Sequence, residues 1–206
     1  MTPLEMLLIG FAVGLTGAMA PGPMLFATIE SSLRAGWAAG PKIVLGHAVL
    51  EAFISILIVL GLSAVVSDSI IRTISFAGGL SLCIFGLFIL KGRKKASPDI
   101  EHTPAAAGPV FAGIITSASN PYFWLWWLSA GNSLIMEGLK TGLIAAGIFL
   151  TGHWIADTVW YSFVSVSLSR GKKFMSDDIY RHTLTACGLF LLVFGLWFII
   201  RQFSPA

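Results

Sequence analysis

Long apolar segments constrain the fold of this chain more than any other feature of its sequence. A hydrocarbon core of about 30 Å is crossed by about 20 helical residues. Six segments approach or exceed that length, four without Asp, Glu, Lys or Arg and two interrupted by one acid each: 6–29, 43–67, 73–90, 103–136, 141–169 and 183–200. We therefore predict six transmembrane spans within one domain, residues 1–206.

The composition excludes an ordinary soluble domain. Hydrophobic residues make up 56% of the chain and charged residues 11%, and the mean hydropathy is +0.85. Because lipid offers no partner for backbone N–H and C=O groups, such segments must be helices unless they form a closed barrel. They lack the alternation of barrel strands. The fold class expected is an all-α integral membrane protein.

The charge distribution predicts an orientation. Although the net charge is +3, the basic residues are spread over several loops, which argues against a nucleic-acid partner. Ten Lys and Arg residues follow the first, third and fifth segments, and three lie on the other side: Arg34, Lys42, Lys91, Arg93, Lys94, Lys95, Arg170, Lys172, Lys173 and Arg181 against Arg72, Lys140 and Arg201. By the positive-inside rule both termini are expected on the outer face.

The two halves of the chain resemble each other. The stretch FAVGLTGAMAP at 11–21 shares five residues with FAGIITSASNP at 111–121, and GLSLCIFGL at 79–87 shares six of nine residues with 188–196. A repeat of three spans must enter the membrane from opposite faces, as in many secondary transporters. We predict an inverted repeat, with residues 1–95 and 108–206 joined by a cytoplasmic linker, 96–107.

Prolines are expected to break the first and fourth spans. Pro21, Gly22 and Pro23 interrupt the first, because proline removes an N–H group and the residue before it avoids helical geometry. Asn120 and Pro121 repeat this pattern in the fourth, with Asn120 as an N-cap. The positive end of a half-helix suits an anion such as a carboxylate. The alternative is a pair of ordinary proline kinks.

Two histidine–acid pairs lie inside apolar segments. His47 and Glu51, and His153 and Asp157, are each four residues apart and therefore share a helix face. One interpretation is structural, with each acid neutralised by its own histidine or protonated, so that the pairs hold helices together. Another is handling of protons or a substrate ammonium group, because imidazole titrates near neutral pH. A third is a divalent metal site.

Three further features have mainly structural interpretations. Glu30 and Arg34 are four residues apart, which favours a surface ion pair over a gate. The aromatic run at 122–127 is typical of an interfacial belt, although its position after a break leaves a binding role open. Gly10, Gly14 and the glycines of the third and sixth spans favour close helix packing or homodimer contacts.

Together, APGP at 20–23, the basic loop after the third span and NP at 120–121 resemble the lysine exporter (LysE) superfamily. The six segments and the chain length fit this resemblance throughout. It implies a multi-pass protein of the inner membrane that exports amino acids using the proton gradient. It marks Pro21, Gly22, Pro23, Asn120 and Pro121 as motif positions. The histidine–acid pairs are not carried over from the family.

The sequence therefore predicts a proton-coupled exporter of amino acids or similar zwitterions, without a cofactor or bound metal. The half-helix ends would hold the carboxylate, and Glu51 and Asp157, tuned by His47 and His153, would couple protons or receive the ammonium group. The alternative is a divalent metal exporter using the same four side chains. An enzyme with Ser117 or Ser119 as nucleophile near His153 is not favoured, since no G-x-S-x-G or H-E-x-x-H motif is present.

Overall fold

The computed structural model describes residues 2–61, 68–93 and 108–201, and within these ranges the chain is helical with no strand. The expected linker, 96–107, and Lys94 and Lys95 lie outside the described residues. The helices run in this order: α1 Pro3–Met19, α2 Pro23–Ala35, α3 Ala39–Val59, α4 Asp68–Gly92, α5 Gly108–Ala118, α6 Pro121–Trp126, the π-helix η3 Trp127–Gly131, α7 Asn132–Thr141, α8 Leu143–Gly171, the 3-10 turn η4 Lys172–Phe174 and α9 Asp177–Arg201.

The first apolar segment is broken where the prolines predict it. A capping box between Thr2 and Glu5 starts α1, which ends at Met19. Helix α2 then begins at Pro23, with Gly22 as an N-cap that has an extended backbone and no side-chain cap. Proline suits the first turn of a helix because the missing N–H group would have no helical partner there. The axes of α1 and α2 differ by 75°.

A second break follows α5 at Ala118. The side chain of Asn120 accepts a hydrogen bond from the Tyr122 N–H group, so Asn120 is the N-cap of α6, as predicted. The helical chain then passes through the π-helix η3, which the sequence did not predict, into α7. Such π turns are found mainly as local bulges within α-helices, often at functional sites.

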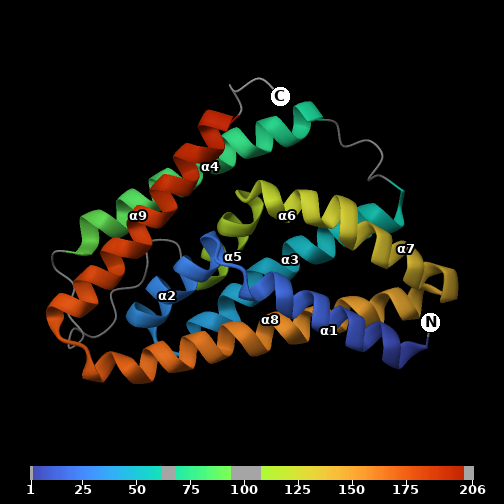
Figure 1. Cartoon of the computed structure of the whole chain (residues 1–206), viewed down its shortest axis with the longest axis horizontal. Helices are drawn as coiled ribbons and strands as arrows, with labels where there is room; N and C mark the ends of the chain where they lie inside the picture. The colour runs from blue at the N-terminus through green and yellow to red at the C-terminus, as the bar shows by residue number, and fades with distance from the viewer. Residues whose placement is uncertain (1, 62–67, 94–107, 202–206) are drawn as a thin grey trace.

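The helices pair between the two halves of the chain. Helix α1 packs on α8, α5 packs on α3, and α4 packs on α9. Figure 1 shows α4 and α9 side by side along one edge, and α1 crossing α8 along another. In the predicted repeat α5 corresponds to α1, and α8 corresponds to α3. The contact between α1 and α8 therefore corresponds to the contact between α5 and α3. The contacts therefore follow the pattern expected of a repeat.

Glycines allow these helices to approach closely. A Cβ atom on Gly46 of α3 would overlap the carbonyl oxygen of Val110 in α5, and one on Gly113 would overlap that of Ile43. Between α4 and α9, Gly79 meets Gly195 and Gly86 meets Gly188 in the same way. The small-residue packing expected from the sequence is present within a single chain.

Among the residues that the structure describes, three helices are long and apolar enough to cross a membrane: α3, α8 with its terminal turn, and α9. The bent pair α1–α2 would make a fourth span. The apolar stretches Phe76–Gly92 in α4 and Gly108–Ala118 in α5 are shorter than this criterion requires. The chain is therefore a helical membrane protein with several apolar spans, whereas the count of six and the inversion of the halves stay predictions.

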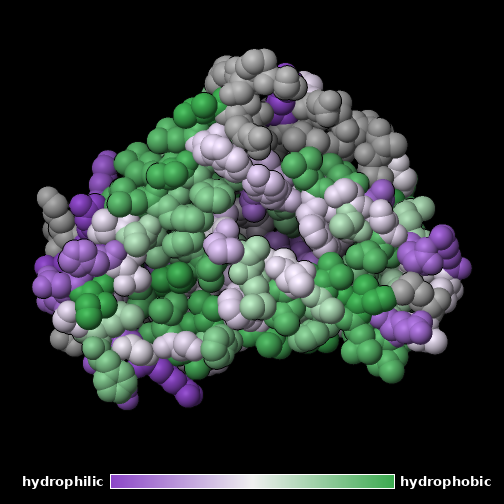
Figure 2. Space-filling view, viewed as in Figure 1, coloured by the Kyte–Doolittle hydropathy of each residue, from purple (hydrophilic) through white to green (hydrophobic). Residues whose placement is uncertain are grey.

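The outer surface is largely apolar, with a hollow near its middle. Exposed large hydrophobic side chains occur along every long helix, as lipid contact requires. Figure 2 shows hydrophobic residues over much of this face, and hydrophilic residues inside the central hollow. The hollow lies where the two broken segments meet α3 and α8.

Candidate functional site

A cavity of about 310 Å³ lies at the middle of the helices. Both helix breaks and both histidine–acid pairs contribute to its wall, although they come from four separate parts of the sequence. The predicted site residues in its lining are Pro21, Gly22, Pro23, His47, Glu51, Asn120, His153 and Asp157. Of the predicted positions only Pro121 does not line it. Its volume is in the range of small-molecule sites.

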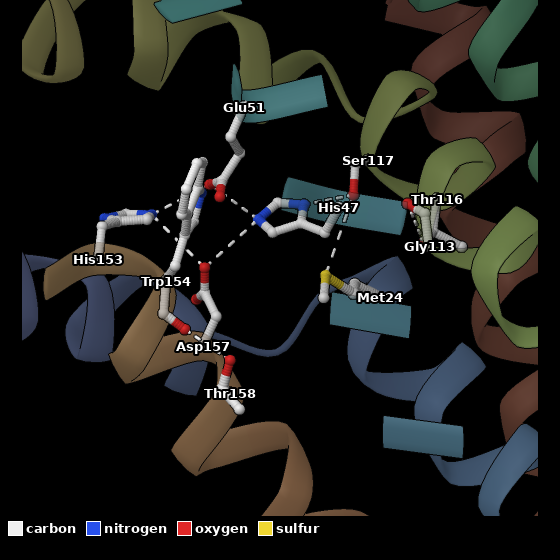
Figure 3. Close-up of polar contacts among 10 residues, drawn as sticks. All are labelled: Met24, His47, Glu51, Gly113, Thr116, Ser117, His153, Trp154, Asp157 and Thr158. Atoms are coloured by element: carbon white, nitrogen blue, oxygen red, sulfur yellow. Dashed lines mark hydrogen bonds and ion pairs between the residues drawn. The ribbon is translucent and has the colours of Figure 1, made fainter. Parts of the chain in front are cut away.

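The two histidine–acid pairs form one cluster across the contact between α3 and α8 (Figure 3). Glu51 Oε1 lies 3.0 Å from His47 Nε2 and 3.1 Å from His153 Nε2. Asp157 Oδ2 lies 3.8 Å from His47 Nε2 and 3.7 Å from His153 Nε2. Glu51 and Asp157 are 1% and 2% exposed. Each carboxylate therefore faces both imidazoles, so the pairing within each helix is present and a second pairing between the helices is added to it.

Burial makes this cluster energetically demanding. Charged groups that leave water are stable only when they are paired, hydrogen-bonded or bound to a metal. Within the described residues, Glu51 Oε2, Asp157 Oδ2 and His153 Nδ1 have no hydrogen-bond partner. The cluster is thus only partly satisfied by the protein, which leaves capacity for protons, a substrate group or a cation.

Ser117 connects this cluster to the second helix break. Its Oγ atom lies 2.6 Å from His47 Nδ1, and its hydroxyl group donates to Met24 Sδ at 3.9 Å. With that hydroxyl hydrogen directed at Met24, the Nδ1–H group of His47 donates to Ser117. The Nε2 atom lies 3.0 Å from Glu51 Oε1, so one proton must lie between them, either on the imidazole or on the carboxyl group. Ser117 therefore orients the ring of His47 toward Glu51.

The serine, histidine and acid do not form a hydrolase triad. In the Ser-His-Asp triad the serine contacts Nε2 and the acid contacts Nδ1. Here Ser117 contacts Nδ1 and Glu51 contacts Nε2. The hypothesis of an enzyme required a serine nucleophile near His153. Ser117 instead lies near His47.

Aromatic residues after the second break form one wall of the cavity. Tyr122, Phe123, Trp126 and Trp127 all line it, and Trp127 is 1% exposed. The rings of Trp126 and Trp127 lie 5.1 and 5.4 Å from the ring of His153. The interpretation of this run as an interfacial belt is wrong for Phe123 and Trp127, which are 8% and 1% exposed, whereas Tyr122 is 50% exposed at the rim of the cavity.

The starts of α2 and α6 differ in their capping. Gly22 offers no side chain, so the start of α2 has no side-chain cap and opens on the cavity. At α6 the Asn120 side chain already accepts from one N–H group. The expectation of a free, positive helix end is therefore met more fully at Pro21–Pro23 than at Asn120–Pro121.

Glu30 and Arg34 form the predicted ion pair, with 2.5 Å between Glu30 Oε1 and Arg34 Nε. The expectation that this pair lies on the surface is wrong, since the Glu30 side chain is 3% exposed and that of Arg34 15%. Helix α2 packs here against α8 and α9, which cover the pair. A spacing of four residues predicts the pairing but not the neighbours that bury it.

Tyr161 is a cavity residue that the sequence argument missed. It is 4% exposed and lies four residues beyond Asp157 in α8, so His153, Asp157 and Tyr161 share one helix face. Extending the four-residue spacing by one step would have found it. No comparable spacing signal points to Met24 or Phe194, which also line the cavity.

A comparison with known families matches the LysE type translocators over residues 15–202. The chain belongs to this family. The resemblance seen in the sequence is confirmed, and the protein is a multi-pass membrane transporter. Membership of a translocator family also supports the view that it is not an enzyme.

Two curated relatives cover most of this translocator. It is 22% identical over 197 residues to the "Putative amino acid efflux protein YcgF" of Bacillus subtilis (strain 168), covering 90% of this chain and 91% of the relative. It is 29% identical over 156 residues to the "Uncharacterized membrane protein YahN" of Escherichia coli (strain K12), covering 72% and 68%. No solved structure matches the chain significantly.

Proposed function

We propose that this LysE type translocator exports amino acids or similar small zwitterions across the cytoplasmic membrane, driven by the proton gradient. One observation carries the proposal: an open helix start and a buried histidine–acid cluster line the same cavity. A relative named as an amino acid efflux protein, aligned over 91% of its length, supports the substrate class.

The two ends of a zwitterion would find different partners in this cavity. The start of α2, at Pro21–Pro23, offers the positive end of a half-helix to the substrate carboxylate. The start of α6, at Asn120–Pro121, would add to it from the other half. Glu51 and Asp157 would receive the ammonium group, and the apolar part of the substrate would pack on Trp126 and Trp127.

The same acids would couple transport to protons. A proton and a substrate ammonium group neutralise the same buried carboxylate, so each excludes the other. His47 and His153, which both contact Glu51, would pass protons to and from the acids as the cavity opens to either side. Exchange of a proton for the substrate would then drive export.

Transport by reconstituted protein tests this proposal. Purified protein in liposomes with an imposed pH gradient is assayed with each radiolabelled standard amino acid in turn. We expect at least one to be transported, and we expect Glu51→Gln and Asp157→Asn to reduce the gradient-driven rate about 100-fold or more. Glu137→Gln is the matched control, because Glu137 is exposed and pairs with Lys140 on α7; it should transport normally.

Two results would contradict the proposal. Wild-type protein that moves no amino acid but moves Mn²⁺ or Cd²⁺ would identify a metal exporter. Wild-type rates in folded Glu51→Gln and Asp157→Asn proteins, with folding checked by thermal unfolding, would remove these acids from the coupling mechanism.

A further inference from the structure

We propose that the cluster of His47, Glu51, His153 and Asp157 binds one divalent transition-metal ion of the Zn²⁺ type, and that this ion inhibits transport. The binding part of the proposal stands independently of amino acid export. The inhibitory part rests on the proposed function, because it requires Glu51 and Asp157 to receive the substrate.

Three of the four side chains already lie close enough to hold one ion. The ligand atoms of His47, Glu51 and Asp157 all lie within 4.8 Å of one another. Zinc bonds to histidine nitrogen and carboxylate oxygen are about 2.0–2.1 Å long, which places neighbouring ligand atoms about 3.4 Å apart in a tetrahedron. His153 Nε2 lies 3.1 Å from Glu51 and 3.7 Å from Asp157, so its ring needs to move to complete a four-ligand site.

The donor atoms favour a transition metal over Mg²⁺ or Ca²⁺. Two imidazole nitrogens and two carboxylate oxygens form a mixed set, whereas Mg²⁺ and Ca²⁺ prefer oxygen ligands. A doubly charged ion also balances the two carboxylates while both histidines stay neutral. The buried cluster then carries no net charge, which removes the main cost of its burial.

Two further features also point to a ligand. The Ser117 hydroxyl holds Nδ1 of His47, so that Nε2 is free to donate its lone pair, as outer partners of metal-binding histidines do. In addition, one of the donor atoms themselves, Asp157 Oδ2, is buried and has no hydrogen-bond partner among the described residues. An unpartnered buried carboxylate oxygen aimed at two imidazoles is an available metal ligand.

Bound metal would occupy atoms that the proposed function assigns to the substrate. An ion bound to Glu51 and Asp157 would exclude the substrate ammonium group from both acids, which line the cavity. The ion would also join α3 to α8 through two ligands from each helix. Both effects predict inhibition rather than passage of the ion.

Metal titration of the purified protein tests the binding. Zn²⁺ is titrated calorimetrically, and Co²⁺ is titrated while tryptophan fluorescence is recorded, since Trp126 and Trp127 lie close to His153. We expect one ion per chain and quenching by Co²⁺. His153→Gln and Glu51→Gln should each weaken binding about tenfold or more. His182→Gln is the matched control, because His182 is exposed and four residues after Asp178, outside the cluster.

Each outcome decides one part of the proposal. Absence of Zn²⁺ binding to wild-type protein, or equal binding by the His153→Gln and wild-type proteins, overturns the site. If both ligand variants fail to fold, the wild-type protein still decides, because Co²⁺ that binds without quenching tryptophan fluorescence lies elsewhere.

The inhibitory part has its own readout in liposomes. We expect Zn²⁺ to stop amino acid transport by wild-type protein at the concentrations that fill the site, without accumulating inside. Binding without inhibition, or accumulation of radioactive Zn²⁺, overturns inhibition and leaves the site in place. Failure of amino acid transport in the absence of metal would instead contradict the proposed function.

Discussion

At the scale of single residues, Ser117 has the most specific role that the structure assigns outside the four titratable side chains. It connects α5, next to the second break, to His47 on α3 and to Met24 on α2. A movement of the helix at the second break would therefore shift the ring of His47 through its hydrogen bond with Ser117. We regard Ser117 as a positioning residue, since in the proposed function it would act on the substrate through His47.

Replacing Ser117 separates this role from simple packing. Ser117→Ala leaves the Nδ1–H group of His47 unpaired, which should cost about 1–3 kcal/mol of stability and free the ring to turn. We expect slower gradient-driven transport and an altered dependence of its rate on pH. Ser117→Thr keeps the hydroxyl group and should restore both. Equal pH profiles for the Ala variant and wild type would show that Ser117 only fills space.

At the scale of elements, glycines determine how closely the helices of the two halves approach. Helices α3 and α5 touch through Gly46 and Gly113, and α1 and α8 touch through Gly10 and Gly152. Because Gly46 directly precedes His47, the α3–α5 contact also places a titratable side chain. Packing and site geometry are therefore coupled at this position.

Gly46→Ala should push α3 away from α5, because its Cβ atom would overlap backbone atoms that cannot move alone. We expect a loss of about 1–3 kcal/mol, seen as a lower thermal unfolding midpoint in detergent, together with reduced transport. Gly147→Ala on α8 is the matched control, since nothing lies within 4 Å of the added atom. If the Gly46→Ala protein is as stable as the control, α3 and α5 can move apart without loss of stability, and the prediction is wrong.

At the scale of the whole molecule, the contacts between halves agree with a repeat, and the basic residues predict how it sits in the membrane. The loop between α2 and α3, and the turn η4 after α8, should face the cytoplasm. The end of α7 should face outward. This arrangement would open the cavity to opposite sides in turn, as the proposed export requires.

Labelling of single cysteines tests this orientation. We expect an impermeant maleimide to label Lys140→Cys in intact cells, but to label Trp37→Cys and Lys173→Cys only after permeabilisation. All three side chains are exposed, and the natural Cys83 and Cys187 are buried and can be replaced by Ala. Trp37 and Lys140 lie at corresponding places in the two halves, so labelling of Trp37→Cys and Lys140→Cys from the same side would refute the inverted arrangement.

Much of the local structure was readable from the sequence. Apolar length predicted the long helices α3, α8 and α9, and proline chemistry predicted the breaks before Pro23 and at Asn120. These features depend on each residue and its near neighbours, and the backbone must satisfy its own hydrogen bonds in lipid wherever the helix lies. The four-residue spacing likewise placed His47 with Glu51 and His153 with Asp157.

The tertiary structure alone decided which faces meet. The repeat favoured one shared cavity for the two histidine–acid pairs, but not the particular contacts of Glu51 with His153 and of Ser117 with His47. It also did not predict that Glu30 and Trp127 are buried. The physical reason is that the spacing of residues in one helix determines only which of its own side chains share a face. It does not determine the partner helix, because lipid tails are as apolar as leucine and give no preference among partners. Close packing at small residues supplied that preference, and the site exists because α3 and α8 face each other.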